Sequence, residues 1–378
     1  MKHIIKKRLT GFLFILNIGC ILLALMGTLA PYANPVKWWP IAIAGLVFPG
    51  AILLVILFGI AWLFIKPKWS FYALATLLIA IPAIYTSFGM HLFSSFKTEK
   101  EKTALRVLSW NVGLMNYTTA DTMVAIKNNI TIFEKIKNTG ADVVCLQEFF
   151  SEIVPGHHYN IMDSLSRNLG YPYYYFSRDV PKVDGNFFSG TIIFSRYPIV
   201  DSSKWVFPFT GLYSGSIIKA GIVVNKDTIN VFSSRLQLMK FQGSEYQEVH
   251  NIKTISGNTI SDTKSMIGKL RFGYGFLSQQ ADYVRAVLDS SQRPCIFAGD
   301  LNNIPLSYTY GKVKGNLHDA WANQGKGFGR TFQYISPTLR VDHFFYDDHF
   351  KLLQVKRIME EGETDHHGIL ADMLIKTK

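Results

Sequence analysis

Residues 295–302 read CIFAGDLN, a run of apolar residues that ends in an aspartate and an asparagine. The pattern recurs in RVLSWNV at residues 106–112 and in ADVVCLQE at residues 141–148, where polar side chains again close an apolar run. Short apolar runs bounded by polar turns are typical of buried β-strands. Because loops held by a rigid sheet are where catalytic groups concentrate, these strand ends indicate a candidate site.

The same interpretation extends along the chain from Leu105. Apolar runs predict strands at Leu105–Trp110, Asp142–Leu146, Gly190–Ser195, Ile217–Val224, Thr228–Ser233, Pro294–Ala298, Arg340–Tyr346 and Gly368–Ile375. Helical periodicity appears at Thr122–Asn138 and at Leu277–Asp289. Many strands with few, widely spaced helices predict an α/β fold of sheets packed on each other with helices outside. The Ser-, Gly- and Lys-rich stretch Gly243–Gly275 is predicted to be a long insertion or mobile loop.

The first hundred residues differ from the rest. Three stretches, residues 9–36, 38–65 and 69–96, contain no Asp, Glu, Lys or Arg. About 20 apolar residues cross a bilayer as a helix, so each stretch is long enough to span a membrane. We therefore expect a tail at residues 1–8, three transmembrane helices within 9–96, a linker at 97–104 and a catalytic domain at 105–378.

The short loops between these stretches predict the orientation of the protein. The tail carries Lys2, Lys6, Lys7 and Arg8, the second loop carries Lys66 and Lys68, and the first loop has only Lys37. Basic residues favour the cytoplasmic side, although Lys97, Lys100 and Lys102 oppose this count. The expectation is an integral protein of a bacterial inner membrane, with a cytoplasmic N-terminus and an extracytoplasmic catalytic domain.

The net charge of +12 is unevenly distributed. The first 104 residues hold ten Lys or Arg and two acids, whereas the remaining 274 residues hold 29 basic and 25 acidic side chains. The basic balance is therefore not a nucleic-acid footprint spread over the whole chain. Abundant aromatic and branched residues exclude disorder, and three cysteines are too few for a disulfide scaffold or a thiolate zinc site.

The polar residues at the strand ends form a set suited to phosphoester chemistry. The candidates are Asn111, Glu148, Asp300, Asn302, Asp342, Asp365 and His366. Any one of them alone is expected to cap a turn or face water. Together, carboxylates, two amides and a His–Asp pair suit metal-assisted phosphoryl hydrolysis, because hard oxygen ligands prefer Mg²⁺ or Mn²⁺ and a positioned carboxylate can activate water.

Six motifs in order give the chain a resemblance. RVLSWNV, ADVVCLQE, SGTIIFSRYPI, CIFAGDLN, LRVDHFF and TDHHGIL resemble the endonuclease/exonuclease/phosphatase superfamily, which has the DNase I-like fold, over nearly all of residues 105–378. The resemblance implies a four-layer α/β/β/α sandwich, preceded here by three transmembrane helices. It implies metal ligation by Asn111 and Glu148, with Asp365 close to the metal. Asp300 and Asn302 would activate water and hold the phosphate, and His366, paired with Asp342, would stabilise developing charge.

Three positions depart from the family pattern. SSRLQ places Arg235 where many relatives have a histidine, Asn303 stands where an Asp is common, and TDHHG lacks a following proline. An arginine can bind phosphate oxygens but cannot pass a proton to a leaving group, so Arg235 is counted as a candidate catalytic residue and also as a candidate solvent-exposed residue.

Several functions remain open at this level. The first is a membrane-anchored, metal-dependent phosphodiesterase acting on nucleic acid, or on a phospholipid or sphingolipid headgroup. A phosphomonoesterase and a catalytically impaired membrane scaffold are the alternatives. No protein partner can be inferred. Cys145 and Cys295 are expected to be inert buried thiols, with a bridge between them left open.

Overall fold

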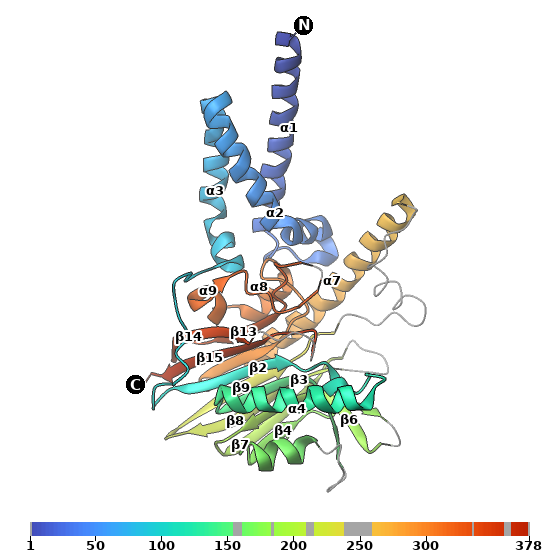
Figure 1. The fold of residues 1–378 in the computed structure, drawn as a ribbon, viewed down its shortest axis with the longest axis vertical. Coiled ribbons are helices and arrows are strands. Elements are labelled where there is room, and N and C mark those ends of the chain that lie inside the picture. Colours follow the sequence, from blue (N-terminus) through green and yellow to red (C-terminus); the bar gives the residue numbers. More distant parts are fainter. Residues whose placement is uncertain are drawn as a thin grey trace.

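The computed structural model describes residues 2–153, 161–182, 185–208, 215–237, 259–334, 336–358 and 364–376. Three apolar helices, α1 (Lys2–Thr28), α2 (Pro35–Ile65) and α3 (Pro67–Ser87), stand as a bundle above a β-rich domain (Figure 1). Each is long and apolar enough to cross a membrane. The N-terminus lies at the end of the bundle away from the β-rich domain (Figure 1).

The third apolar helix, α3, is shorter than its apolar stretch. We expected this stretch to continue to Phe96, but the helix ends at Ser87 and Gly89–Met90 form strand β1, which pairs with β12 (Lys326–Gly327) of the β-rich domain. The residues from Met90 to Ser95 are exposed, so the absence of charge there does not mark a continuation of the helix. In α2, Asn34 caps the first turn by accepting from the Val36 amide at 2.9 Å.

Two sheets form the β-rich domain. The seven-stranded sheet has the order β14-β15-β2-β3-β6-β4, with β5 paired to β6, and the six-stranded sheet has the order β11-β13-β10-β9-β8-β7. The first sheet consists of β2 (Leu105–Asn111), β3 (Val143–Glu152), β4 (Tyr173–Phe176), β5 (Val180–Lys182), β6 (Phe187–Ser195), β14 (Phe350–Ile358) and β15 (Gly368–Ile375). The second consists of β7 (Ile199–Val206), β8 (Ser216–Val224), β9 (Asp227–Ser234), β10 (Cys295–Asp300), β11 (His318–Asp319) and β13 (Asp342–Tyr346).

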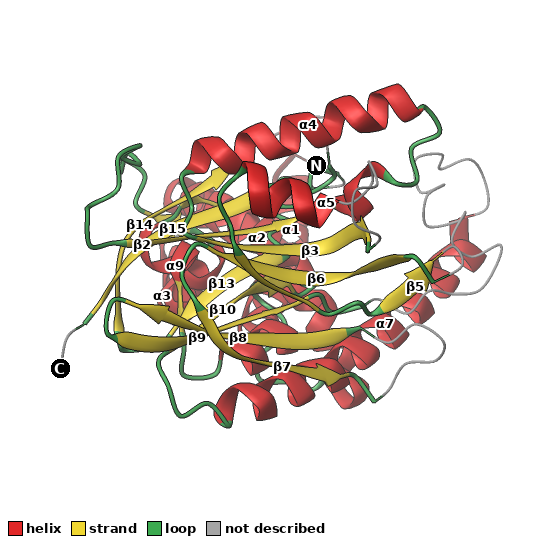
Figure 2. Ribbon diagram, turned by 90° about the horizontal axis from the view of Figure 1, so that it is seen from below, coloured by secondary structure: helices red, strands yellow, loops and turns green. Residues whose placement is uncertain are grey.

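The two sheets pack face to face with helices on both outer faces (Figure 2). The outer helices and short turns are α4 (Thr122–Thr139), α5 (Ile161–Asp163), α7 (Thr259–Asp289), α8 (Tyr308–Lys314), α9 (Ala320–Gln324), the 3₁₀ turn Gly113–Asn116 and the π turn Ser164–Asn168. Helix α4 covers the first sheet and α7 the second (Figure 2). The predicted four-layer α/β/β/α sandwich with three apolar helices before it is confirmed.

The central strands are buried on both faces, which explains their continuous apolar sequences. In β2, Val107 faces the other sheet while Leu108 packs under α4, because successive side chains of a strand point to opposite faces. In β10, Ile296 lies between the sheets and Phe297 lies under α7. Each strand therefore joins two layers of core.

Helix α7 is longer than its periodicity indicated. Leu277, Ala281, Val284 and Leu288 do face the core together, as predicted. The helix nevertheless begins at Thr259, so residues 259–275 of the expected loop are helical, and residues 243–258 lie outside the described part. The extra turns project beyond the sandwich toward the level of the three-helix bundle (Figure 1).

The two candidate cysteines are free and buried. Cys145 lies between the sheets and Cys295 belongs to the cluster under α7, so the two thiols sit in different layers. Burial raises the pKa of each thiol to about 12, which keeps both protonated and unreactive.

A buried ion pair attaches the segment after the bundle to the sandwich. Arg106 and Asp372 stand opposite each other on β2 and β15, and Arg106 donates to both carboxylate oxygens at 2.7 and 2.8 Å. Arg106 also donates at 2.9 Å to the carbonyls of Thr98 and Thr139. One guanidinium thus joins the linker, the end of α4 and two central strands.

This pair gives a first prediction. Asp372→Asn should lower the free energy of unfolding by about 3–5 kcal/mol, because it leaves Arg106 as an uncompensated buried charge. The exposed Asp227 offers a matched control, and Asp227→Asn should change stability by less than about 0.5 kcal/mol. Denaturation in mild detergent, followed by tryptophan fluorescence, measures both. Equal stabilities for the two variants would contradict the structural role of the pair.

Candidate functional site

The predicted polar residues meet at one edge of the sandwich. Strands β2 and β3 are parallel, so Asn111 and Gln147 end side by side in the first sheet. In the second sheet, Asp300 and Asp342 are directly paired between β10 and β13. Because the sheets face each other, the strand ends of both converge there.

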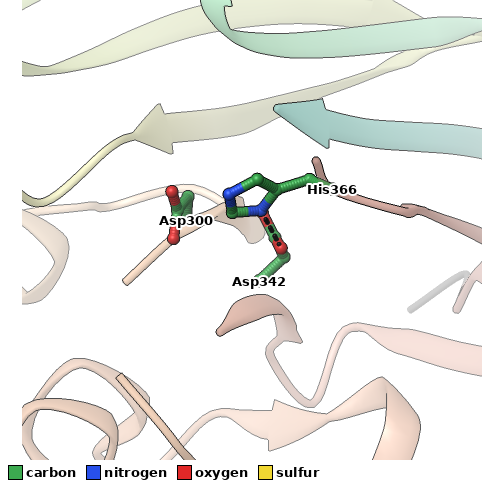
Figure 3. A group of neighbouring side chains, drawn as sticks. All are labelled: Asp300, Asp342 and His366. Atoms are coloured by element: carbon green, nitrogen blue, oxygen red, sulfur yellow. Dashed lines mark hydrogen bonds and ion pairs between the residues drawn. The ribbon is translucent and has the colours of Figure 1, made fainter. Parts of the chain in front are cut away.

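Three side chains form the buried centre of the site. His366 Nδ1 lies 2.8 Å from Asp342 Oδ2, and Asp300 lies on the other side of the imidazole ring (Figure 3). One ligand atom from each of Asp300, Asp342 and His366 lies within 4.8 Å of the others, and all three residues are buried. The expected Asp342–His366 pair is therefore present in the geometry.

Asp300 is surrounded by hydrogen-bond donors. Its Oδ2 accepts from Asn111 Nδ2 at 3.0 Å, and its Oδ1 accepts from the Asn302 amide at 2.7 Å. Asn302 Nδ2 donates to the Leu236 carbonyl at 2.6 Å and reaches Asp300 Oδ2 at 3.3 Å. These bonds fix the carboxylate and hold Asn302 in a left-handed conformation with φ of 49°.

Glu148 reaches the site because its strand is irregular. The pairing of β3 with β6 shifts register between Leu146 and Phe149, and Glu148 has a φ of 49°. Such a bulge re-aims a side chain that would otherwise follow the regular alternation. Glu148 Oε1 accepts from Asn111 Nδ2 at 3.2 Å, so the two expected metal ligands are in contact.

Arg235 belongs to the same group. It follows β9, and its Nε lies 2.7 Å from Glu148 Oε1 and 3.7 Å from Asp300 Oδ2. Its side chain is 29 % exposed, so it is neither free in solvent nor fully buried. The alternative in which Arg235 merely points into solvent does not fit this geometry.

The charges inside the site shift two pKa values. Burial, followed by the negative charge of Asp342, raises the pKa of Asp300 to about 7. Burial alone would lower the pKa of His366, but the charge and hydrogen bond of Asp342, together with Asp300 and Asp365, raise it to about 10. At neutral pH the centre therefore holds a cationic imidazolium between two carboxyl groups.

The residues present fit a hard divalent cation. Glu148 and Asp300 offer carboxylate oxygens around Asn111 Nδ2, and carboxylate oxygen is a ligand type that Mg²⁺ and Mn²⁺ prefer. Asn111 Oδ1 accepts from the Gly113 amide at 3.1 Å, and a flip of the Asn111 amide would turn that oxygen toward the two carboxylates. Glu148 is 22 % exposed and can be reached from solvent. Asp300, Asp342 and His366 also lie close enough to ligate an ion, but there the imidazolium supplies the compensating positive charge. We therefore favour the Asn111–Glu148 side.

Asp365 lies at the rim of this group. It is half-buried, and its carboxylate is placed beside Gly113, two residues after Asn111. A Cβ built on Gly113 would stand 3.7 Å from Asp365 Oδ1. The Asp365 backbone carbonyl accepts from the Gln333 amide at 2.9 Å. The structure thus places Asp365 near the predicted metal ligands.

Three supporting residues were not singled out from the sequence. Gln147 Nε2 donates to Ser109 Oγ in one sheet and to Ser233 Oγ in the other, at 3.2 and 2.9 Å. Thr364 Oγ1 donates to the Asn111 carbonyl at 3.0 Å, and Thr331 Oγ1 accepts from the Asp342 amide at 3.0 Å. Gln147 and Thr364 lie inside the quoted motifs, whereas Thr331 carries no sequence signal.

The two other departures from the family pattern have structural roles. Asn303 is buried and donates from Nδ2 to Thr309 Oγ1 at 3.1 Å, away from the Asp300 carboxylate. His367 donates its amide to the Thr331 carbonyl at 2.7 Å. Neither change removes a side chain from the group around Asp300.

The imidazolium gives a second prediction. The pKa of His366 is raised from about 6.5 to about 10. The contribution of the Asp342–His366 pair to stability is therefore complete below pH 6.5 and is lost as the pH rises toward 10. Asp342→Asn should lower the pKa of His366 by at least about one unit, because the imidazolium loses its main partner. Histidine NMR titration measures this shift.

A remote variant controls for general effects on the titration. Asp347 pairs with the exposed His349 far along the second sheet, and Asp347→Asn should leave the His366 pKa unchanged. A His366 resonance that titrates near pH 6.5 in the unmodified protein would show that Asp342 does not hold the imidazolium.

Comparisons with known proteins agree with this architecture. The sequence profile of the Endonuclease/Exonuclease/phosphatase family matches residues 108–366, and that of a domain of unknown function matches residues 10–87. No curated protein matches the chain significantly.

An endonuclease/exonuclease/phosphatase from Beutenbergia cavernae DSM 12333 is similar in structure, with a TM-score of 0.50 and 20 % identity over 73 % of this chain and 72 % of that one. The human Nocturnin catalytic domain with bound sulfate has a TM-score of 0.50 and 16 % identity over 72 % of this chain and 94 % of that one. Since the family profile spans more than half of the chain, this protein belongs to the endonuclease/exonuclease/phosphatase family.

Proposed function

We propose that the protein is a membrane-anchored, divalent-metal-dependent phosphodiesterase whose site lies outside the cytoplasm. The observation that carries the proposal is the buried Asp300–His366–Asp342 group beside the oxygen-rich Asn111–Glu148 pair. A cation-binding edge next to an imidazolium suits a substrate with a negatively charged reacting centre. The family's members act on phosphoesters, which supports the same reaction class.

Each residue has a role in this proposal. Asn111 and Glu148 hold Mg²⁺ or Mn²⁺, with Asp365 close by, and the bound ion would offset phosphate charge and polarise the P–O bond. Asp300, fixed by Asn111 and Asn302, accepts a proton from the attacking water, and Asn302 holds the phosphate. A pKa near 7 suits Asp300 to that task at neutral pH. His366, kept cationic by Asp342, stabilises the charge that develops on the phosphate oxygens.

Nucleic acid is our first candidate substrate because of the family resemblance. The electrostatic attraction of this domain for nucleic acid is weak, since residues 105–378 carry 29 basic and 25 acidic side chains.

A phospholipid or sphingolipid headgroup is the second candidate, and one observation favours it. Helix α3 has 21 residues, about 32 Å, which matches a bilayer core of about 30 Å. Near the end of α3, the Thr86 carbonyl accepts from Arg340 at 2.7 Å. The candidate site residue Asp342 follows Arg340 by two positions, so the site lies close to the end of this helix.

A substrate panel tests the reaction and its metal dependence. The full chain in mild detergent would be assayed with Mg²⁺ and with EDTA on plasmid DNA, RNA, sphingomyelin, bis-p-nitrophenyl phosphate and the monoester p-nitrophenyl phosphate. We expect EDTA-sensitive hydrolysis of the activated diester and of one natural class. Release of phosphate from monoesters alone would replace the proposal by a phosphomonoesterase. Hydrolysis of none of these would indicate a catalytically impaired scaffold.

Glu148 provides the third prediction. Glu148→Gln removes a full negative charge while keeping the shape of the side chain, so Mg²⁺ affinity should fall at least about tenfold. Excess Mn²⁺ should restore part of the activity, because Mn²⁺ binds sites of nitrogen and oxygen ligands differently from Mg²⁺. Glu134→Gln, on the exposed face of α4, is the control and should bind metal as the unmodified protein does. Calorimetric titration decides; an unchanged affinity in Glu148→Gln would place the ion elsewhere.

Arg235 provides the fourth prediction. A guanidinium can hold two phosphate oxygens, but it does not release its proton at workable pH. Rates should therefore depend steeply on leaving-group acidity, with nitrophenyl esters hydrolysed much faster than alkyl esters. Arg235→Lys should weaken substrate binding by about tenfold or more, and Arg235→His should improve turnover of alkyl diesters. Steady-state kinetics on one aryl and one alkyl diester test this, and three identical profiles would remove Arg235 from the site.

A further inference from the structure

Both loops that carry the site residues continue into contacts with the membrane helices. The first follows β10, which ends at Asp300, and in it Leu306 stands four residues after Asn302. Leu306 is only 2 % exposed and belongs to the apolar cluster of the bundle, together with Ile21 and Phe48. A residue close in sequence to the catalytic aspartate is therefore part of the core of the membrane domain.

The contact between this loop and α2 is made by backbone. A Cβ built on Gly45 would collide with the Leu306 carbonyl oxygen and would stand 2.7 Å from the Cβ of Ala30. A glycine at this position allows the helix and the loop to approach to a distance that no larger residue permits. Gly50, five residues further along α2, has no atom within 4 Å of such a Cβ.

The second loop contacts the end of α3 through a buried arginine. Arg340 has no exposed surface and donates from Nη2 to the Thr86 carbonyl at 2.7 Å, one residue before α3 ends. The last carbonyls of a helix have no partner within the helix, so this bond satisfies one of them. Arg340 Nη1 donates to Asp319 Oδ2 at 2.7 Å, and Tyr310 donates to the same oxygen at 2.7 Å.

The two loops also contact each other. The Leu301 amide donates to the Val341 carbonyl at 2.9 Å, and His343 Nε2 lies 2.9 Å from the Asn303 carbonyl. Burial, followed by the charge of Arg340, lowers the pKa of His343 to about 4, so its ring is neutral and donates to that carbonyl. A displacement of either loop is thus transmitted to the other.

We propose that Leu306 and Arg340 are positioning residues, through which helices α2 and α3 hold Asp300, Asn302 and Asp342 in their reactive arrangement. The membrane bundle is then part of the active-site scaffold and more than a tether. This inference rests on the proposed phosphodiesterase function. Since a displacement of about 1 Å can lower a rate by about a hundredfold, small movements of these loops matter.

Two glycine variants of the full chain in detergent test the α2 contact. Gly45→Val should lower kcat on bis-p-nitrophenyl phosphate by about 10- to 100-fold, with a smaller change in KM, because the loop that carries Asp300 and Asn302 moves while Arg235 and the proposed metal ligands Asn111 and Glu148 keep their places. Gly50→Val, which adds the same side chain to the same helix in open space, should retain the unmodified kcat. Hydrogen exchange of the peptide spanning residues 300–307 should accelerate in Gly45→Val and stay unchanged in Gly50→Val.

A second pair keeps the test decisive if Gly45→Val does not fold. Leu306→Ala leaves a cavity at the bundle and should reproduce the loss of kcat and the faster exchange, whereas Leu306→Met fills the space and should restore both. Rates would be compared on monodisperse protein well below its melting temperature, where a merely weakened fold has no effect on kcat.

The outcomes separate the two proposals. Unchanged kcat and exchange in Gly45→Val and Leu306→Ala overturn the positioning role of Leu306 and α2 while leaving the phosphodiesterase intact. Equal losses in Gly45→Val and Gly50→Val also overturn it, because they would reflect a general defect of α2. If the unmodified protein hydrolyses no phosphoester, the proposed function fails and the inference about catalysis fails with it, even if exchange still shows the mechanical contact.

Discussion

Asp300 is a carboxyl group without exposed surface, and the arrangement of the site depends on how its charge is compensated. Burying an unpaired carboxylate is costly, so native structures supply donors or cations around it. Here Asn111 and the Asn302 amide donate to it, His366 stands beside it as an imidazolium, and Arg235 lies 3.7 Å away. Asp342 adds a second negative charge, which raises the pKa of Asp300 while keeping His366 protonated.

Backbone conformations around this group are unusual in the same small region. Glu148 and Asn302 both have a φ of 49°, and Leu114 and Met115, just after Asn111, have φ values of 56° and 51°. Left-handed conformations of residues other than glycine carry a cost that surrounding structure must offset, and they cluster at functional sites. Behind them, the Gln147 amide joins Ser109 and Ser233 across the two sheets and fixes the separation on which the site geometry rests.

The membrane bundle and the sandwich share structure. Leu306 is packed among bundle residues, Arg340 binds the end of α3, and β1 pairs with β12. An anchor alone would need only a linker, but here the loops that carry the candidate site residues and the three apolar helices bury surface against each other. Under the proposed membrane anchoring, this arrangement would hold the site near the bilayer surface, within reach of a lipid headgroup.

The sequence by itself determined the features that depend on local pattern. Absence of charge over three long stretches predicted the three long apolar helices, strand periodicity predicted the central strands, and six motifs predicted the fold and named the candidate site residues. The edge strands β7 and β14 were missed, because their half-exposed residues show no continuous apolar run. The extension of α7 was not predicted because the sequence of its first turns is rich in Ser, Thr, Gly and Lys, a composition typical of loops.

Only the tertiary structure decided which of these residues touch. Asn111 and Asp300 are 189 positions apart, and Arg340 and Thr86 are 254 apart, so no local pattern could pair them. The proximity of Arg235 to Glu148, the left-handed turn at Glu148 and the insertion of Leu306 into the bundle depend on how two sheets and three helices pack. Hydrophobic period and charge are properties of neighbouring residues, whereas these contacts arise when distant segments are buried together.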